Sequence, residues 1–333
     1  MKVHLFLLSL VAALALCSRS FAAPLYSQDF DSDDTANWTV NDNGNGTNAA
    51  NFFYDYSTLG IPSAPHSSGG TTRGLKLQAN ISGSGPASGV LPGISVSPTG
   101  QSFTGNYKLE FDWWHNWIGS TSTGIGSASG GSGSTQVSEF GILSSGTSSN
   151  YVGASDGLFY AADGDGASSA DYRVYSSEKP GSYQLADAHN TYAAGDRNSS
   201  NAYYQTLFPA GNSVPAAQNS AFPTTQFGTS LAGAAGFKWH DVVIEKTGNI
   251  VTWTVDGTLL ATTDTTNFTV PTSGNNILFG HGDTSLGAGT PAATFAAVDF
   301  TLIDNVRVVP EPGTLALCLL GGIGIGAMRR RRS

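Results

Sequence analysis

The stretch FKWHDVVIEKTGNIVTWTVDGTLLA, residues 237–261, decides the fold that the sequence predicts. Polar and apolar residues alternate along it in two runs, and a short polar segment at residues 246–249 separates them. A period of two with β-branched and aromatic side chains is typical of strands, and the polar segment joins them as a hairpin. Asp256 and Gly257 supply a second turn, so we expect a three-stranded antiparallel meander. Its apolar face consists of Val242, Ile244, Val251, Trp253 and Val255.

The pattern W-H-D-V…V-T-W-x-V-D-G, from Trp239 to Gly257, resembles the central meander of the laminin-G and concanavalin-A-like jelly rolls. Weaker similarity extends through residues 276–280 and 303–308, and the latter segment resembles the closing strand of that family. The resemblance implies an all-β domain over residues 23–308, an antiparallel two-sheet jelly-roll sandwich. Because this sandwich carries lectins, hydrolases and adhesive modules alike, it implies no single function.

The first 22 residues have the organisation of a secretory signal peptide. Lys2 gives a positive start, residues 5–16 form an apolar run, and Ser20-Phe21-Ala22 is a small-x-small cleavage site. The apolar run is too short for a permanent membrane helix. We therefore expect signal peptidase to remove residues 1–22 during export.

The other end of the chain carries a second targeting pattern. Pro310, Glu311 and Pro312 precede an apolar run at residues 315–328, which is followed by Arg329, Arg330, Arg331 and Arg332. This order of motif, apolar run and arginines resembles the PEP-CTERM sorting signal. Arginines remain on the cytoplasmic side of a membrane and act as a stop. At ~1.5 Å per residue the apolar run falls short of a ~30 Å hydrocarbon core, as suits a short, transient transmembrane helix.

The resemblance implies that residues 309–333 anchor the chain in the inner membrane until an exosortase-type enzyme processes it. The protein would then reach the cell surface or the extracellular space. An ordinary C-terminal anchor is the alternative.

Cysteine usage and charge limit the function classes. Cys17 and Cys318 are the only cysteines, and both lie in the segments expected to be removed, so the exported chain has no disulfide. Residues 24–309 contain nine Lys and Arg against 23 Asp and Glu, a net charge near −14. This charge excludes nucleic acid as the expected partner and favours binding of divalent cations.

Residues 144–236 fit the sandwich template least. Tyrosines and phenylalanines occur there among Ser, Gly, Asn and Asp, and residues 173–175 have a strand-like composition. We expect a long insertion of loops and short strands on the rim of the sandwich, with its aromatic rings covering one sheet. Long loops are also where such a sandwich carries its function.

Glu110 and Asp112 share one face of a predicted strand, because side chains alternate along it. The resemblance suggests a comparison with jelly-roll β-glucanases, whose catalytic strand carries a second glutamate two or three residues after the aspartate. Here Trp114 and His115 occupy those positions, and paired carboxylates are needed for retaining hydrolysis. We therefore interpret Glu110 and Asp112 as outward polar residues and expect that the protein is not an enzyme.

Asp163 and Asp165, in the segment Asp-Gly-Asp-Gly, are the first metal-binding candidate, and Asp283 after His281-Gly282 is another. Alternating aspartates in a loop suit calcium, which accepts several oxygen ligands in flexible geometry. The later bidentate glutamate of an EF-hand is absent, and Asp-Gly pairs equally form turns. Calcium is the only cofactor that the sequence suggests.

Trp113, Trp114 and Trp117 are the candidate sugar-binding residues, with His115 and Asn116 between them. Indole rings beside an amide suit stacking on sugars. Alternation directs one of Trp113 and Trp114 into the core and the other outward. The outward ring is either covered by the insertion or forms a platform for sugar.

Two functions therefore stay open. The first is an exported cell-surface or matrix protein whose non-catalytic jelly roll serves adhesion or structure. The alternative is a lectin-like protein that binds extracellular polysaccharide, assisted by calcium. A polysaccharide hydrolase or lyase is less favoured, because no second glutamate accompanies Glu110 and Asp112.

Overall fold

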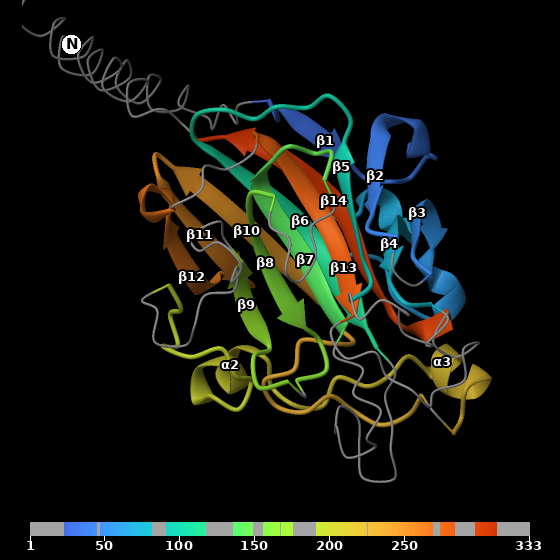
Figure 1. Cartoon of the computed structure of the whole chain (residues 1–333). Coiled ribbons are helices and arrows are strands. Elements are labelled where there is room, and N and C mark those ends of the chain that lie inside the picture. The colour runs from blue at the N-terminus through green and yellow to red at the C-terminus, as the bar shows by residue number, and fades with distance from the viewer. Residues whose placement is uncertain are drawn as a thin grey trace, which may run out of the picture.

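The computed structural model describes residues 23–44, 47–81, 91–117, 136–148, 156–166, 168–175, 191–224, 226–268, 274–283 and 297–311. Their strands form two antiparallel sheets in two layers, and the two short helices lie at one end (Figure 1). The predicted all-β, two-sheet sandwich is confirmed.

Sheet A has eight strands. In spatial order seven of them are β12 (Thr258–Asp264), β11 (Ile250–Val255), β10 (Trp239–Thr247), β6 (Tyr107–Asn116), β14 (Phe300–Pro310), β4 (Arg73–Gln78) and β3 (Ala49–Asp55), and β1 (Tyr26–Gln28) pairs with β14. Sheet B has six strands in the order β2 (Trp38–Asp42), β5 (Gly93–Pro98), β13 (Asn276–Asp283), β7 (Gln136–Ser144), β8 (Leu158–Asp163) and β9 (Tyr172–Tyr175). The short 3-10 helices are η1 (Thr35–Asn37), η2 (Tyr56–Leu59), η3 (Ser68–Gly70) and η5 (Thr265–Asn267).

The predicted meander is β10, β11 and β12. Ile244 lies opposite Trp253 and Val242 opposite Val255 across the first hairpin, so the apolar faces of its strands coincide. β10 also pairs with β6 along Trp239–Lys246, which extends the meander into the middle of sheet A. The hairpin that the sequence predicts is therefore part of the larger of the two sheets.

The main core lies between the sheets and confirms the predicted facing of the strands. Trp253 is fully buried and packs on Phe140 and Tyr160, at ring-centroid distances of 5.8 and 5.0 Å. All predicted core positions are buried: Leu75, Leu77, Leu109, Phe111, Val242, Ile244, Val251, Trp253 and Val255.

The segment 144–236 is more than an insertion on the rim. It supplies β8 and β9, which extend sheet B, and the short helices α2 (Ala202–Leu207) and α3 (Ala216–Ala221). Tyr172 and Tyr204 stack at 4.3 Å and belong to the main core rather than to a separate cover. The strand expected at residues 173–175 is confirmed as part of β9.

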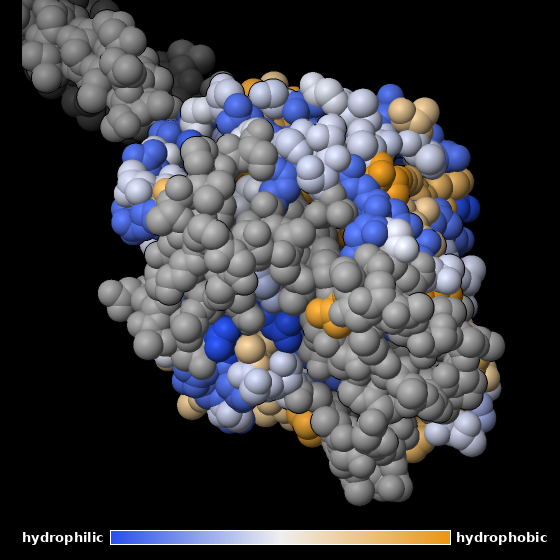
Figure 2. Space-filling model, in the orientation of Figure 1, coloured by the Kyte–Doolittle hydropathy of each residue, from blue (hydrophilic) through white to orange (hydrophobic). Residues whose placement is uncertain are grey.

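The predicted signal peptide and most of the sorting tail lie outside the described residues. Within the described ranges we find no helix with the length and apolar character needed to cross a bilayer. The described residues that are visible on the face in Figure 2 are mostly hydrophilic. The exposed large hydrophobic side chains among the described residues are Leu25, Val40, Leu231, Ile250 and Leu259.

Candidate functional site

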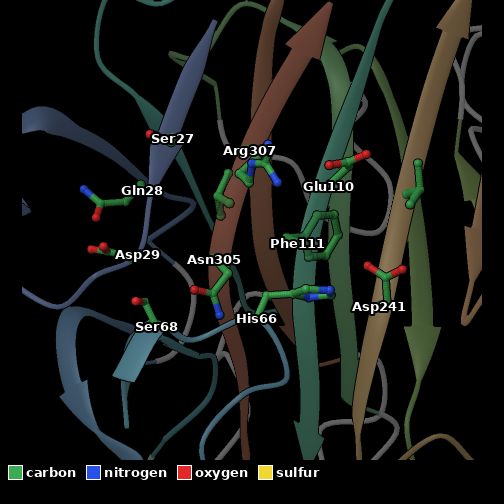
Figure 3. Close-up of a pocket in the computed structure, with 12 residues that line it drawn as sticks. Ser27, Gln28, Asp29, His66, Ser68, Glu110, Phe111, Asp241, Asn305 and Arg307 are labelled. Carbon is green, nitrogen blue, oxygen red and sulfur yellow. The ribbon is translucent and has the colours of Figure 1, made fainter. Parts of the chain in front are cut away.

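A cleft of about 540 Å³ opens on the outer face of sheet A, the face turned away from sheet B (Figure 3). Strands β1, β14, β6 and β10 contribute to it, and the segment before β4 borders one side. Most of the lining side chains are polar. The lining residues are Ser27, Gln28, Asp29, His66, Ser68, Glu110, Phe111, Asp241, Val243, Asn305, Val306 and Arg307.

Strand alternation places acidic side chains in this cleft. Leu109 and Phe111 of β6 enter the core, so Glu110 and Asp112 face outward, as the sequence predicts. Asp241 lies directly opposite Asp112 on the antiparallel strand β10. The outer face of two neighbouring strands therefore carries a row of three carboxylates.

An irregularity in β14 places the side-chain amide of Asn305 next to this row of carboxylates. The register of β14 against β6 shifts between Asp304 and Arg307, and Asn305 in the bulge has a left-handed φ of 53°. Asparagine tolerates this conformation better than most residues. The Asn305 Nδ2 donates to Asp112 Oδ2 at 2.8 Å and to Ser67 Oγ at 3.1 Å. The bulge thereby turns an amide toward the carboxylates (Figure 3).

His66 reaches across β6 from the segment between η2 and β4 (Figure 3). Its Nδ1 lies 2.7 Å from Asp112 Oδ1, and its backbone N–H donates to Asp112 Oδ2 at 3.1 Å. The Asp112 side chain is fully buried, whereas 59% of the His66 side chain is exposed. The hydrogen bond of the imidazole to the Asp112 carboxylate raises the pKa of His66 above its usual value, and nearby Asp241 and Glu110 act in the same direction.

Asp241 completes a group of three metal-ligating side chains. One ligand atom each from His66, Asp112 and Asp241 lies within 4.8 Å of the others. Partial burial raises the pKa of Asp241 above its usual value, against the opposing effect of His66. The corner of the cleft thus combines one imidazole with two carboxylates from three separate segments.

Asp304 forms a buried carboxyl site beside this corner. It accepts hydrogen bonds from Tyr56 Oη at 3.0 Å, Ser67 Oγ at 3.1 Å and the Asn305 backbone N–H at 2.7 Å. Burial raises the pKa of Asp304 to about 7, although these hydrogen bonds favour the charged form. Asp304 is therefore partly protonated near neutral pH.

The three tryptophans of the predicted sugar platform lie inside the protein. Trp113 is in the main core. Trp114 faces outward on sheet A but packs on Trp239 at 5.8 Å in a second apolar cluster that also contains Trp117. Segments near η2 and Val214 of the 144–236 segment both contribute to this cluster. All three tryptophans are buried, so none of them forms an exposed platform for a sugar ring.

Asp163 and Asp165, the predicted calcium ligands, lie at the end of β8 and outside the cleft. The Asp165 backbone N–H donates to Asp163 Oδ1 at 3.2 Å, whereas Asp163 Oδ2 is buried without a hydrogen-bond partner. Burial and the neighbouring charge of Asp165 raise the pKa of Asp163 well above its usual value. A cation here would relieve the repulsion between the two carboxylates.

The start of the predicted sorting motif belongs to the sandwich. Pro310 is the last residue of β14, and Glu311 forms an ion pair with Lys108 at 3.0 Å. Pro312 and the arginines 329–332 lie outside the described residues.

The sequence did not single out His66 and did not connect Asp241 with Glu110 and Asp112. The outward facing of Asp241 follows from its strand pattern, but its position opposite Asp112 requires the pairing of β10 with β6. His66 lies in an irregular segment rich in Ser, Gly and Pro, where no periodicity indicates its direction. The signal available was the presence of three outward carboxylates on two predicted strands.

No family model matches the chain, and no curated protein matches it. Among solved structures, the chain is similar to a protein reported under the endo-acting O-glycanases of human gut microbiota, at 13% identity and a TM-score of 0.44, over 87% of this chain and 100% of that one. An endo-β-1,4-glucuronan lyase from Trichoderma reesei matches at 12% identity and a TM-score of 0.39, over 87% of this chain and 96% of that one. The carbohydrate-binding module CBM66 from Bacillus subtilis matches at 9% identity and a TM-score of 0.36, over 82% of this chain and 95% of that one.

At these identities the similarity concerns the fold alone. The expectation that this protein is not an enzyme is nevertheless corrected. The matching structures include a glucuronan lyase, so the sandwich is shared with enzymes and does not exclude catalysis. The absence of a second glutamate after Asp112 excludes only one particular arrangement of catalytic residues on β6.

Proposed function

We propose that the protein binds carbohydrate in the cleft on the outer face of sheet A. This proposal replaces the adhesive or structural role expected first. The observation that carries it is the composition of the cleft: an open volume of about 540 Å³ lined by amide, hydroxyl, carboxylate and guanidinium groups. Such groups donate and accept hydrogen bonds with the hydroxyls of a sugar.

The charge of the cleft narrows the class of sugar. The acidic residues that line the cleft are Asp29, Glu110 and Asp241, whereas its basic residues are Arg307 and the titratable His66. A ligand with uronic-acid or sulfate groups would face like charge there. We therefore expect a neutral polysaccharide, held by hydrogen bonds rather than by stacking, because the candidate tryptophans are buried.

The remaining parts of the proposal rest on the sequence motifs. Signal peptidase would release the chain after Ala22. An exosortase-type enzyme would then process the tail near Pro310, Glu311 and Pro312, and deliver the sandwich to the cell surface or the extracellular space. The acidic net charge of the sandwich suits a soluble domain in that setting.

A glycan array of neutral and uronic-acid polysaccharides, followed by affinity electrophoresis on the hits, tests the proposal. Glu110→Gln and Arg307→Gln should each weaken retention on a neutral polysaccharide by about tenfold, the loss of one or two hydrogen bonds. Glu245→Gln is the matched control, since Glu245 lies on β10 of the same sheet but does not line the cleft.

Retention after treatment with EGTA and re-addition of Ca²⁺ tests the predicted role of Asp163 and Asp165. A calcium-assisted lectin would be supported if Ca²⁺ restores retention of the wild type on polysaccharide but does not restore retention of Asp163→Asn. If no neutral polysaccharide is retained, or if all variants bind like the wild type, the cleft is not the sugar site.

A further inference from the structure

We infer that His66, Asp112 and Asp241 form a binding site for a divalent transition-metal ion, with zinc as the fitting ion. Their ligand atoms lie within 4.8 Å of one another at one corner of the cleft. This site is separate from the predicted calcium position at the end of β8. It also does not depend on sugar binding, because metal binding is measured without any glycan.

The tertiary structure forces the two carboxylates together. Asp112 and Asp241 are register partners on adjacent antiparallel strands, and like charges at such positions destabilise a sheet. Asp112 is also fully buried, and a buried charge requires a compensating partner. A cation between the two side chains would offset both effects.

The described residues supply little permanent positive charge to this corner. Among their ion pairs, only His66 contacts Asp112, and no Lys or Arg is paired with Asp112 or Asp241. Lys238 pairs with Asp256 at 3.6 Å instead. Asn305 donates a neutral hydrogen bond to Asp112, which fixes the direction of that carboxylate without neutralising it.

The ligand atoms indicate which metal fits. An imidazole nitrogen with two carboxylate oxygens suits zinc and its neighbours among the transition metals, whereas calcium prefers an all-oxygen shell. Two ligand atoms on a tetrahedral zinc ion lie roughly 3.3 Å apart. The His66 Nδ1 and Asp112 Oδ1 atoms are now 2.7 Å apart, so a small movement of the exposed imidazole would admit the ion.

The site is also open to solvent and to a ligand. His66 and Asp241 line the cleft, and Figure 3 shows the imidazole extending over β6 toward Asp241. Three protein ligands leave at least one position of a four-coordinate ion for water or another oxygen. A metal held here would therefore face the volume in which we propose that sugar binds.

Competition with a chromophoric chelator measures the affinity of purified, tag-free protein for Zn²⁺. We expect the wild type to bind one Zn²⁺ per chain, with a dissociation constant in the micromolar range or below. His66→Gln and Asp241→Asn should each weaken binding by at least about tenfold. His66→Gln changes a side chain that is 59% exposed, and a far-UV circular dichroism spectrum shows whether the variant remains folded.

Asp29→Asn is the control, because Asp29 lines the same cleft but does not belong to the group of three. Its affinity for Zn²⁺ should stay within about twofold of the wild type, and an excess of Ca²⁺ should not displace the bound Zn²⁺. Titration with Co²⁺ should give visible absorption bands that disappear in His66→Gln.

Three results would overturn the inference. The wild type could fail to bind Zn²⁺ stoichiometrically. Both cluster variants could bind it as tightly as the wild type. Asp29→Asn could lose as much affinity as they do, which would indicate a diffuse acidic surface. Any of these would leave His66 and Asp112 as a simple hydrogen-bonded pair.

Discussion

Replacing Asp304 by asparagine should change how the stability of the sandwich depends on pH. Asp304 is buried on β14 and accepts hydrogen bonds from Tyr56, Ser67 and Asn305. Burial raises its pKa from the ordinary 3.8 to about 7. Asparagine has nearly the same shape and no charge, and the two hydroxyl groups can rotate to accept from its amide.

The sign follows from proton linkage. Between about pH 4 and pH 7 the unfolded carboxyl group has released its proton while the folded one retains it. The free energy of unfolding therefore falls as the pH rises through this window. A difference of about three pKa units between the folded and unfolded states corresponds to about 4 kcal/mol of unfolding free energy in total. Of this contribution, the wild type loses about 3 kcal/mol as the pH rises from about 5 to above 7.

Urea unfolding at about pH 5 and about pH 8 measures the effect. The stability of Asp304→Asn relative to wild type should improve by about 3 kcal/mol between the two pH values. Other buried carboxyl groups with raised pKa values, such as Asp171, titrate in both proteins and cancel in the comparison.

Asp264→Asn is the control, because Asp264 is only partly buried and a hydrogen bond from Thr266 lowers its pKa. This variant should show no gain at the higher pH. A difference between Asp304→Asn and wild type that stays constant with pH would refute the reasoning, since Asp304 would then ionise as it does in the unfolded chain.

Two further predictions concern the core and the ends of the chain. Trp253→Ala should lower the free energy of unfolding by about 3–5 kcal/mol in a denaturant titration, because it leaves a cavity among Phe140 and Tyr160. Leu259→Ala is the control, because Leu259 is an exposed residue of the same meander, and it should change the free energy of unfolding by less than about 1 kcal/mol. A similarly small loss for Trp253→Ala would mean that the Trp253 ring is not part of the core. N-terminal sequencing of exported protein should begin at Ala23, and its intact mass should lack residues 329–332. Recovery of those arginines would instead identify the tail as an ordinary anchor.

Local pattern determined much of the fold. The alternation in residues 237–261 predicts both hairpins and the buried side of each strand, because side-chain direction along a strand depends only on position. Val242, Ile244 and Trp253 are therefore buried as expected. The same rule predicts that Glu110 and Asp112 share the opposite face of β6 from Phe111.

The same rule does not reveal what covers the outer face. Trp114 faces outward on sheet A as alternation allows, yet it is buried against Trp239 in the second apolar cluster. That cluster includes Tyr56 and Ile61, which are distant from Trp114 in sequence. Whether an outward tryptophan forms a sugar platform or part of a core therefore depends on nonlocal packing.

The sequence by itself determined the all-β class, the strand faces and the acidic character of the chain. Only the tertiary structure decided where the acidic groups meet. Asp112 and Asp241 are 129 positions apart in the chain and become neighbours through the pairing of β6 with β10, and His66 joins them from an irregular segment. Strand register and loop direction arise from the packing of the whole sandwich, so no local pattern could have assembled this corner of the cleft.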